Sequence, residues 1–138
     1  MKPFDSIRQA WVAQGKRARL LALTVLITFA SMRAYLHSFP NTDLIVAGYG
    51  IHHLFSGLIL VTIGGVAAVV LPHASAFSSL AVVTFGVGLS LALDEWLYLI
   101  VTDGTNQSYL LPVSLWGGLG AVALAAAYAL VVGRTSNK

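Results

Sequence analysis

Four long apolar stretches occupy most of this chain and constrain its fold more than any other feature. They cover residues 20–36, 44–71, 76–101 and 109–132, and a single membrane crossing takes about 20 residues. Only 9% of the residues are charged, whereas soluble domains carry roughly a quarter. We therefore predict an all-α integral membrane four-helix bundle, since helices satisfy their backbone hydrogen bonds within lipid.

Basic residues gather at the two ends of the chain, in residues 1–19 and 133–138. The loops at 37–43 and 102–108 contain no Lys or Arg, so the positive-inside rule places both termini in the cytoplasm (N-in/C-in). We expect residues 1–19 to form a basic tail, either an amphipathic helix on the membrane surface or an anchor without defined structure. We expect a multi-pass protein of a cytoplasmic (inner) membrane, with the lipid bilayer as partner and no nucleic acid.

Ionisable side chains occur in three of the predicted spans. They are Arg33 in the first span, His52 and His53 in the second, and Asp94 and Glu95 in the third. If the second helix begins at about Leu44, His53 lies roughly 13 Å below its outer end, and Glu95 lies roughly 10 Å below the outer end of the third helix. Because an ionised side chain facing lipid costs several kcal/mol, we predict that these groups meet in one polar layer of the outer leaflet.

Imidazole and carboxylate groups without thiolate are typical ligands of a divalent metal, and the chain contains no cysteine. We predict a site for Zn, Fe or Mn with His53 and Glu95 as first ligands. His52, Asp94 and His37 are expected to be further ligands or supporting groups. A haem held by His37 and His53 is the least favoured alternative.

Arg33 and Tyr98 complete the predicted site, Arg33 as a charge partner of the carboxylates and Tyr98 as a supporting group. No catalytic residue is assigned, and the sequence leaves open whether the protein is an enzyme. One interpretation is a metal-dependent enzyme that acts on a lipid or small amphiphile. The alternatives are a non-enzymatic accessory or structural subunit of a larger membrane complex, and a transporter of ions, protons or a metal.

Glycines mark the predicted packing faces of two spans. They are Gly57 and Gly64 in the second span, and Gly86 and Gly88 in the third. Small residues allow helix backbones to approach closely in lipid, where the hydrophobic effect does not drive association. We expect these faces to pack into a compact bundle. The partners that the sequence leaves open are further copies of the chain, in a homo-oligomer, or the other subunits of a larger membrane complex.

The segments IHHLFSGLILVTIGG and GVGLSLALDEWLYLIVTDG resemble a family of small uncharacterised prokaryotic four-helix integral membrane proteins. In that family, a His-His helix with a following Gly precedes a Gly-x-Gly helix that ends in Asp-Glu, and a short outer loop with Asp follows. The resemblance covers the second and third spans. It implies that the signature positions are His52, His53, Gly57, Gly86, Gly88, Asp94, Glu95 and Asp103. It implies no particular reaction.

Overall fold

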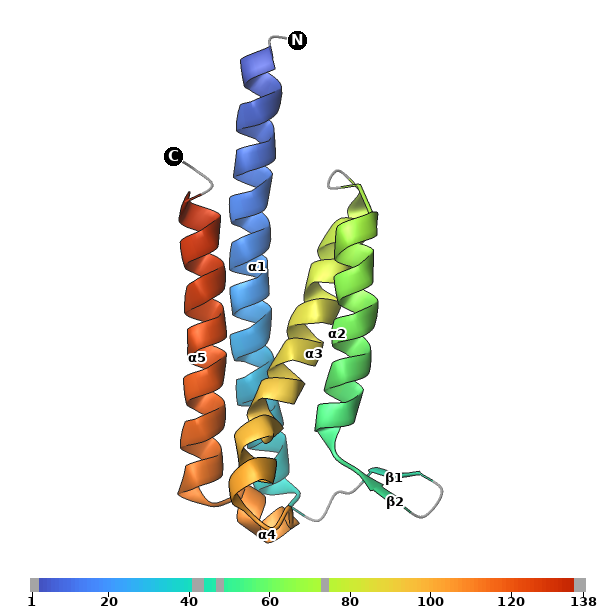
Figure 1. Ribbon diagram of the computed structural model, residues 1–138, viewed down its shortest axis with the longest axis vertical. Helices are drawn as coiled ribbons and strands as arrows, with labels where there is room; N and C mark the ends of the chain where they lie inside the picture. The colour runs from blue at the N-terminus through green and yellow to red at the C-terminus, as the bar shows by residue number, and fades with distance from the viewer. Residues whose placement is uncertain (1–2, 41–43, 47–48, 73–74, 136–138) are drawn as a thin grey trace.

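The chain forms a bundle in which the first turn of α1 and the last turn of α5 lie at the same end (Figure 1). The computed structural model describes residues 3–40, 44–46, 49–72 and 75–135. The long helices there are α1 (Pro3–Ser38), α2 (His53–Val70), α3 (Ala76–Val101) and α5 (Pro112–Thr135). Each contains an apolar stretch of 18 to 27 residues that is long enough to cross a membrane. The all-α architecture with four such helices, predicted from the sequence, is confirmed.

The second apolar stretch is not helical from its start. Strands β1 (Leu44–Val46) and β2 (Tyr49–Ile51) pair antiparallel, and α2 begins only at His53. The prediction of a helix from about residue 44 is therefore wrong at its N-terminal end. The sequence LIVAGYGI gives the reason, because β-branched residues favour strands and the two glycines disfavour helix.

α1 continues without a break through the segment that was expected to be a separate tail. It begins at Pro3, and its apolar stretch covers Val12–Ser38. Proline is tolerated in the first turn of a helix because its missing N–H would have no intrahelical partner there. The basic N-terminal segment is thus a helical extension of the first span.

A single helical turn, α4 (Asn106–Tyr109), lies between α3 and α5.

α3 is the central helix of the bundle. It packs against α1, α2 and α5, whereas α2 packs mainly on α3. Glycines lie where the backbones approach most closely: a Cβ atom on Gly57 would be 2.7 Å from the carbonyl oxygen of Gly88, and one on Gly88 would be 2.6 Å from that of Gly57. Gly86 faces α1, where a Cβ atom would meet Thr24 at 3.0 Å. The contacts between Gly57 and Gly88 fix the register of α2 against α3.

A Cβ atom added at Gly64 would overlap the backbone of Phe85 across the same interface. We expect Gly64→Ala to lower the free energy of unfolding by about 1–3 kcal/mol, because neither backbone can move aside without losing contacts elsewhere. Denaturation of the purified protein in detergent micelles measures this change.

Gly120→Ala is the matched control, because a Cβ atom at Gly120 would have nothing within 4 Å. It should leave the stability unchanged or raise it slightly, since alanine favours helix over glycine. If both substitutions lowered the free energy of unfolding equally, a Cβ atom between α2 and α3 would be no more destabilising than one at an open position, which would contradict this prediction.

Candidate functional site

An ion pair between α1 and α3 lies at the centre of the polar cluster. Nε and Nη2 of Arg33 lie 2.7 and 2.6 Å from Oδ1 of Asp94. The guanidinium also donates to the backbone carbonyl oxygens of Tyr109 at 3.2 Å and Ser114 at 2.9 Å. It lies over the Tyr109 ring, with Cζ 4.1 Å from the ring centroid. Arg33 therefore connects α1 to α3, α4 and α5 at one point.

His53 bridges the two carboxylates of α3. Its Nε2 lies 3.2 Å from Oδ2 of Asp94, and its Nδ1 lies 3.1 Å from Oε1 of Glu95. Ionised carboxylates only accept hydrogen bonds, so a doubly protonated imidazolium is the form that fills both contacts. In that form, the positive charges of His53 and Arg33 would offset the negative charges of Asp94 and Glu95. Charged groups that lie together where solvation by water is poor require a balance of this kind.

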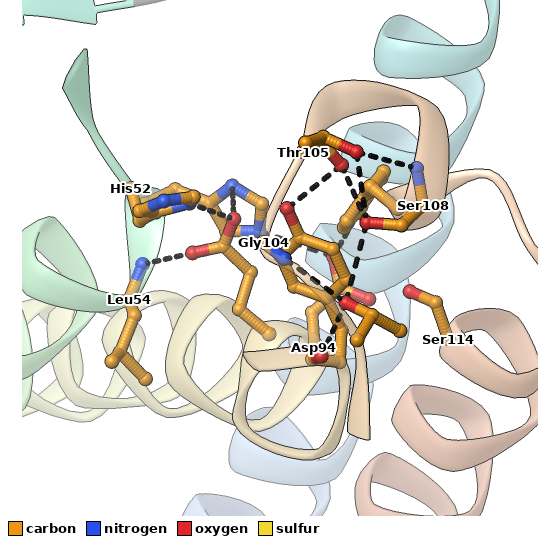
Figure 2. Close-up of polar contacts among 12 residues, drawn as sticks. His52, Leu54, Asp94, Gly104, Thr105, Ser108 and Ser114 are labelled. Carbon is orange, nitrogen blue, oxygen red and sulfur yellow. Dashed lines mark hydrogen bonds and ion pairs between the residues drawn. The ribbon is translucent and has the colours of Figure 1, made fainter. Parts of the chain in front are cut away.

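Glu95 connects α3 to the first turn of α2. Its Oε2 accepts a hydrogen bond of 2.7 Å from the backbone N–H of Leu54 (Figure 2). The first N–H groups of a helix have no partner within the helix, and the helix dipole favours a negative charge beside them. His52 occupies the N-cap position of α2 without capping it through its own side chain. The carboxylate of a neighbouring helix thus caps α2 and stabilises its start at His53.

His52 is held by Glu95 through one ring nitrogen only. Its Nδ1 lies 3.3 Å from Oε1 of Glu95, and a carboxylate acceptor there favours the proton on Nδ1. The side chain is 33% exposed, and within the described residues its Nε2 has no hydrogen-bond partner. An imidazole that a carboxylate orients in this way offers Nε2 as a hydrogen-bond acceptor, general base or metal ligand.

A cavity of about 530 Å³ opens beside His52. It forms because α2 begins level with Glu95 while α3 continues to Val101, so α2 falls short of its neighbours (Figure 1). The polar part of the wall comes from His52, His53, Glu95, Tyr98, Thr105, Asn106 and Tyr109, and the apolar part includes Met32, Leu36, Ile51 and Leu110. The cavity thus joins a charged floor to a wall of hydrocarbon side chains.

Tyr109 is the member of the cluster that the sequence does not single out. Its buried hydroxyl donates to Oδ2 of Asp94, and its ring stands edge-on to His53 and Tyr98 with centroids 5.7 and 5.4 Å away. Burial raises the pKa of the phenol, and the Asp94 charge raises it further, so Tyr109 stays a proton donor. In the sequence, an aromatic residue at the start of a span is typical of the membrane interface, so the hydrogen bond of Tyr109 to Asp94 could not be predicted from its position.

Tyr98 supports the loop over the cavity. It is almost fully buried, its hydroxyl donates to the carbonyl oxygen of Thr105 at 3.0 Å, and its ring lies 6.2 Å from that of His52. In the same loop Asp103 is exposed and accepts hydrogen bonds from the backbone N–H and the hydroxyl of Thr105. Hydrogen bonds from Ser108 and Thr105 lower the pKa of the Asp103 carboxyl. Asp103 therefore orders the loop and lies outside the cluster.

His37 also lies apart from the cluster, in the last turn of α1, where its side chain is exposed and does not line the cavity. Its predicted roles as a further metal ligand and as a haem partner of His53 therefore stay predictions. Among the described residues, no three His, Asp or Glu side chains are arranged to hold a metal ion. The divalent metal therefore stays a prediction.

The fold and the cluster together define a multi-pass helical membrane protein with charged groups buried beside a cavity. Comparison of the chain with protein-family models, with curated proteins and with solved structures finds no match. These comparisons assign no family to the chain.

The charge balance predicts how substitutions in the cluster combine. Asp94→Leu leaves Arg33 buried without its counter-ion, and we expect a loss of about 3–5 kcal/mol in the free energy of unfolding. The double variant Arg33→Met/Asp94→Leu removes both charges and leaves His53 with Glu95, so it should be more stable than Asp94→Leu alone.

Unfolding of the three proteins in the same detergent compares these free energies. A double variant that is no more stable than Asp94→Leu would mean that the two charges do not compensate each other.

Proposed function

We propose that this protein binds a small amphiphile in the cavity, with the polar head at His52 and the tail along the apolar wall. The observation that carries this proposal is the orientation of His52: Glu95 holds Nδ1, and the side chain lines the cavity with Nε2 available. Small-molecule sites typically combine apolar walls with a few placed polar groups, in volumes of about 300–1,000 Å³. The cavity of about 530 Å³ fits that range.

The charge balance beside the cavity favours an uncharged head group. Arg33 and His53 offset Asp94 and Glu95 through contacts of 2.6 to 3.2 Å, so a charged ligand would add a charge without a partner in a poorly solvated site. A hydroxyl group on the ligand can donate to Nε2 of His52. The ligand class that we infer is therefore a neutral, hydroxyl-bearing amphiphile.

The same geometry gives a chemical basis for catalysis. Nε2 of an imidazole oriented by a carboxylate is suited to take a proton from a bound hydroxyl or water. His52 is the residue that would act in this way, with Glu95 as its positioning partner. Ligand binding requires only the hydrogen bond to Nε2, whereas catalysis also requires that Nε2 accepts a proton from the ligand or from water. Enzyme activity is therefore the more specific of the two proposals.

The proposed orientation places the cavity on the outer side of a prokaryotic cytoplasmic membrane. Seven of the eight Lys and Arg residues lie in the two terminal segments, and the exception is Arg33. Basic segments stay in the cytoplasm by the positive-inside rule, and the cavity lies at the end of the bundle opposite to them. An amphiphile of the outer leaflet would then reach it from the membrane.

A divalent metal at His52, His53 and Glu95 is the second candidate, and its binding would require these side chains to move, because in the described residues they do not form a metal site. The observation that favours it is that Nδ1 of His53 and Nδ1 of His52 lie 3.1 and 3.3 Å from one oxygen, Oε1 of Glu95. Ligand atoms around a tetrahedral metal with bonds of about 2.0–2.1 Å are separated by roughly 3.3 Å. Zn, Fe or Mn would suit this donor set.

Photo-crosslinking tests the amphiphile proposal. The probe is a monoacylglycerol with a diazirine in its acyl chain, added to the protein in lipid nanodiscs, and mass spectrometry locates the label. We expect labelling of apolar wall residues such as Met32 and Leu36. His52→Gln should reduce it about tenfold, the size of one lost hydrogen bond of about 1.4 kcal/mol.

His37→Gln is the matched control, because it makes the same change in an exposed His near the same end of the bundle and should leave the labelling unchanged. Equal loss in both variants, or equal labelling by a probe with a phosphate head, would contradict the proposal. Metal analysis of the same preparations decides the second candidate. The metal site would replace the amphiphile site as the proposed function if the protein held about one metal per chain, and if His52→Gln and Glu95→Gln lost that metal while His37→Gln kept it.

A further inference from the structure

A second cavity of about 540 Å³ lies toward the other end of the bundle, between α1, α2, α3 and α5. It forms because α2 packs mainly on α3, so that the α2–α3 pair stands away from α1 in this half of the bundle (Figure 1). Apart from Gln14, Arg17 and Tyr128, all the residues that line it are apolar. We refer to it as the lower groove.

The lower groove requires a hydrocarbon occupant when the helices are in a membrane. Leu21, Val82, Phe85 and Leu89 form part of its wall, and they offer no hydrogen bonds to water. Water in such a space would lose its own hydrogen bonds, so apolar cavities stay dry. The groove lies among the apolar stretches of four membrane-crossing helices, where acyl chains are the molecules at hand.

Positive charge surrounds the end of the lower groove that is nearest the chain termini. Arg17 lines the groove itself, and Arg19 and Arg134 line a smaller cavity of about 220 Å³ between α1 and α5 at the same end. The C-terminal end of α3, which carries Asp94 and Glu95 and is followed by Asp103, lies at the opposite end of the bundle (Figure 1). A ligand in the groove therefore meets the guanidinium of Arg17, a group that binds phosphate oxygens with good geometry, and two further guanidinium groups lie at the neighbouring cavity.

We propose that the lower groove holds one anionic phospholipid, with an acyl chain between the helices and the phosphate at Arg17. The surrounding lipid tails are as apolar as the groove, so an acyl chain in the groove does not by itself favour one lipid over another. The selection of the lipid therefore depends on its charged head group. Basic pockets between membrane helices on the side of the positive segments bind such heads. This site is separate from the amphiphile cavity and does not depend on its function.

Native mass spectrometry tests this site. The protein is reconstituted in vesicles of phosphatidylglycerol and phosphatidylcholine in equal amounts, released in mild detergent, and weighed with its bound lipid. We expect one phosphatidylglycerol to be retained in preference to phosphatidylcholine. Arg17→Gln should lower that preference about fivefold, which corresponds to one interfacial charge of about 1 kcal/mol.

Lys16→Gln is the matched control, because Lys16 is the next residue on the same helix, is exposed and does not line the groove. It should keep the preference, whereas Ala68→Phe, which fills the groove from α2 without changing the charge, should reduce retention of both lipids. Equal loss in Lys16→Gln and Arg17→Gln would show general attraction to the membrane surface in place of a site. A dimer mass without lipid would assign the groove to a second copy of the chain, and either result would overturn the proposal.

Discussion

The ion pair between Arg33 and Asp94 is the contact on which the rest of the site depends. Neither charge could stay inside a bundle of apolar helices without a partner, and each forms several further hydrogen bonds that lead to other elements. A buried pair of this kind adds little net stability, but breaking it is costly. Its main effect is therefore to select one arrangement of α1, α3, α4 and α5 over the many that apolar helices could adopt.

The position of α2 follows from the same cluster. His53 contacts Oδ2 of Asp94, the oxygen that also accepts from Tyr109, and Glu95 caps the first turn of α2. That helix therefore begins at the level of the carboxylates. The chain before it forms a hairpin, which leaves the cavity between α2 and its longer neighbours. The groups that neutralise the charges of the membrane helices are thus also the groups that create a space for a ligand.

The sequence predicts the four apolar helices well, because hydropathy and length decide whether a segment can cross a membrane. It also selects Arg33, His52, His53, Asp94 and Glu95, since ionisable residues are rare in such segments. It does not predict that α2 starts at His53, because an apolar run does not by itself distinguish a strand from a helix. Nor does it identify the contacts of Tyr109 and the cap on Leu54, which depend on how separate helices pack and on no local pattern.

In the proposed site, Arg33, His53, Asp94 and Glu95 form a closed, neutral network beside His52, whose Nε2 is available to a ligand. Nitrogen-15 NMR of protein labelled at histidine, in lipid bilayers at neutral pH, tests it most directly through the ring-nitrogen shifts. We expect both nitrogens of His53 to carry protons, and His52 to have a proton on Nδ1 and none on Nε2. A neutral His53, or a nitrogen of either ring bound to a metal, would contradict it.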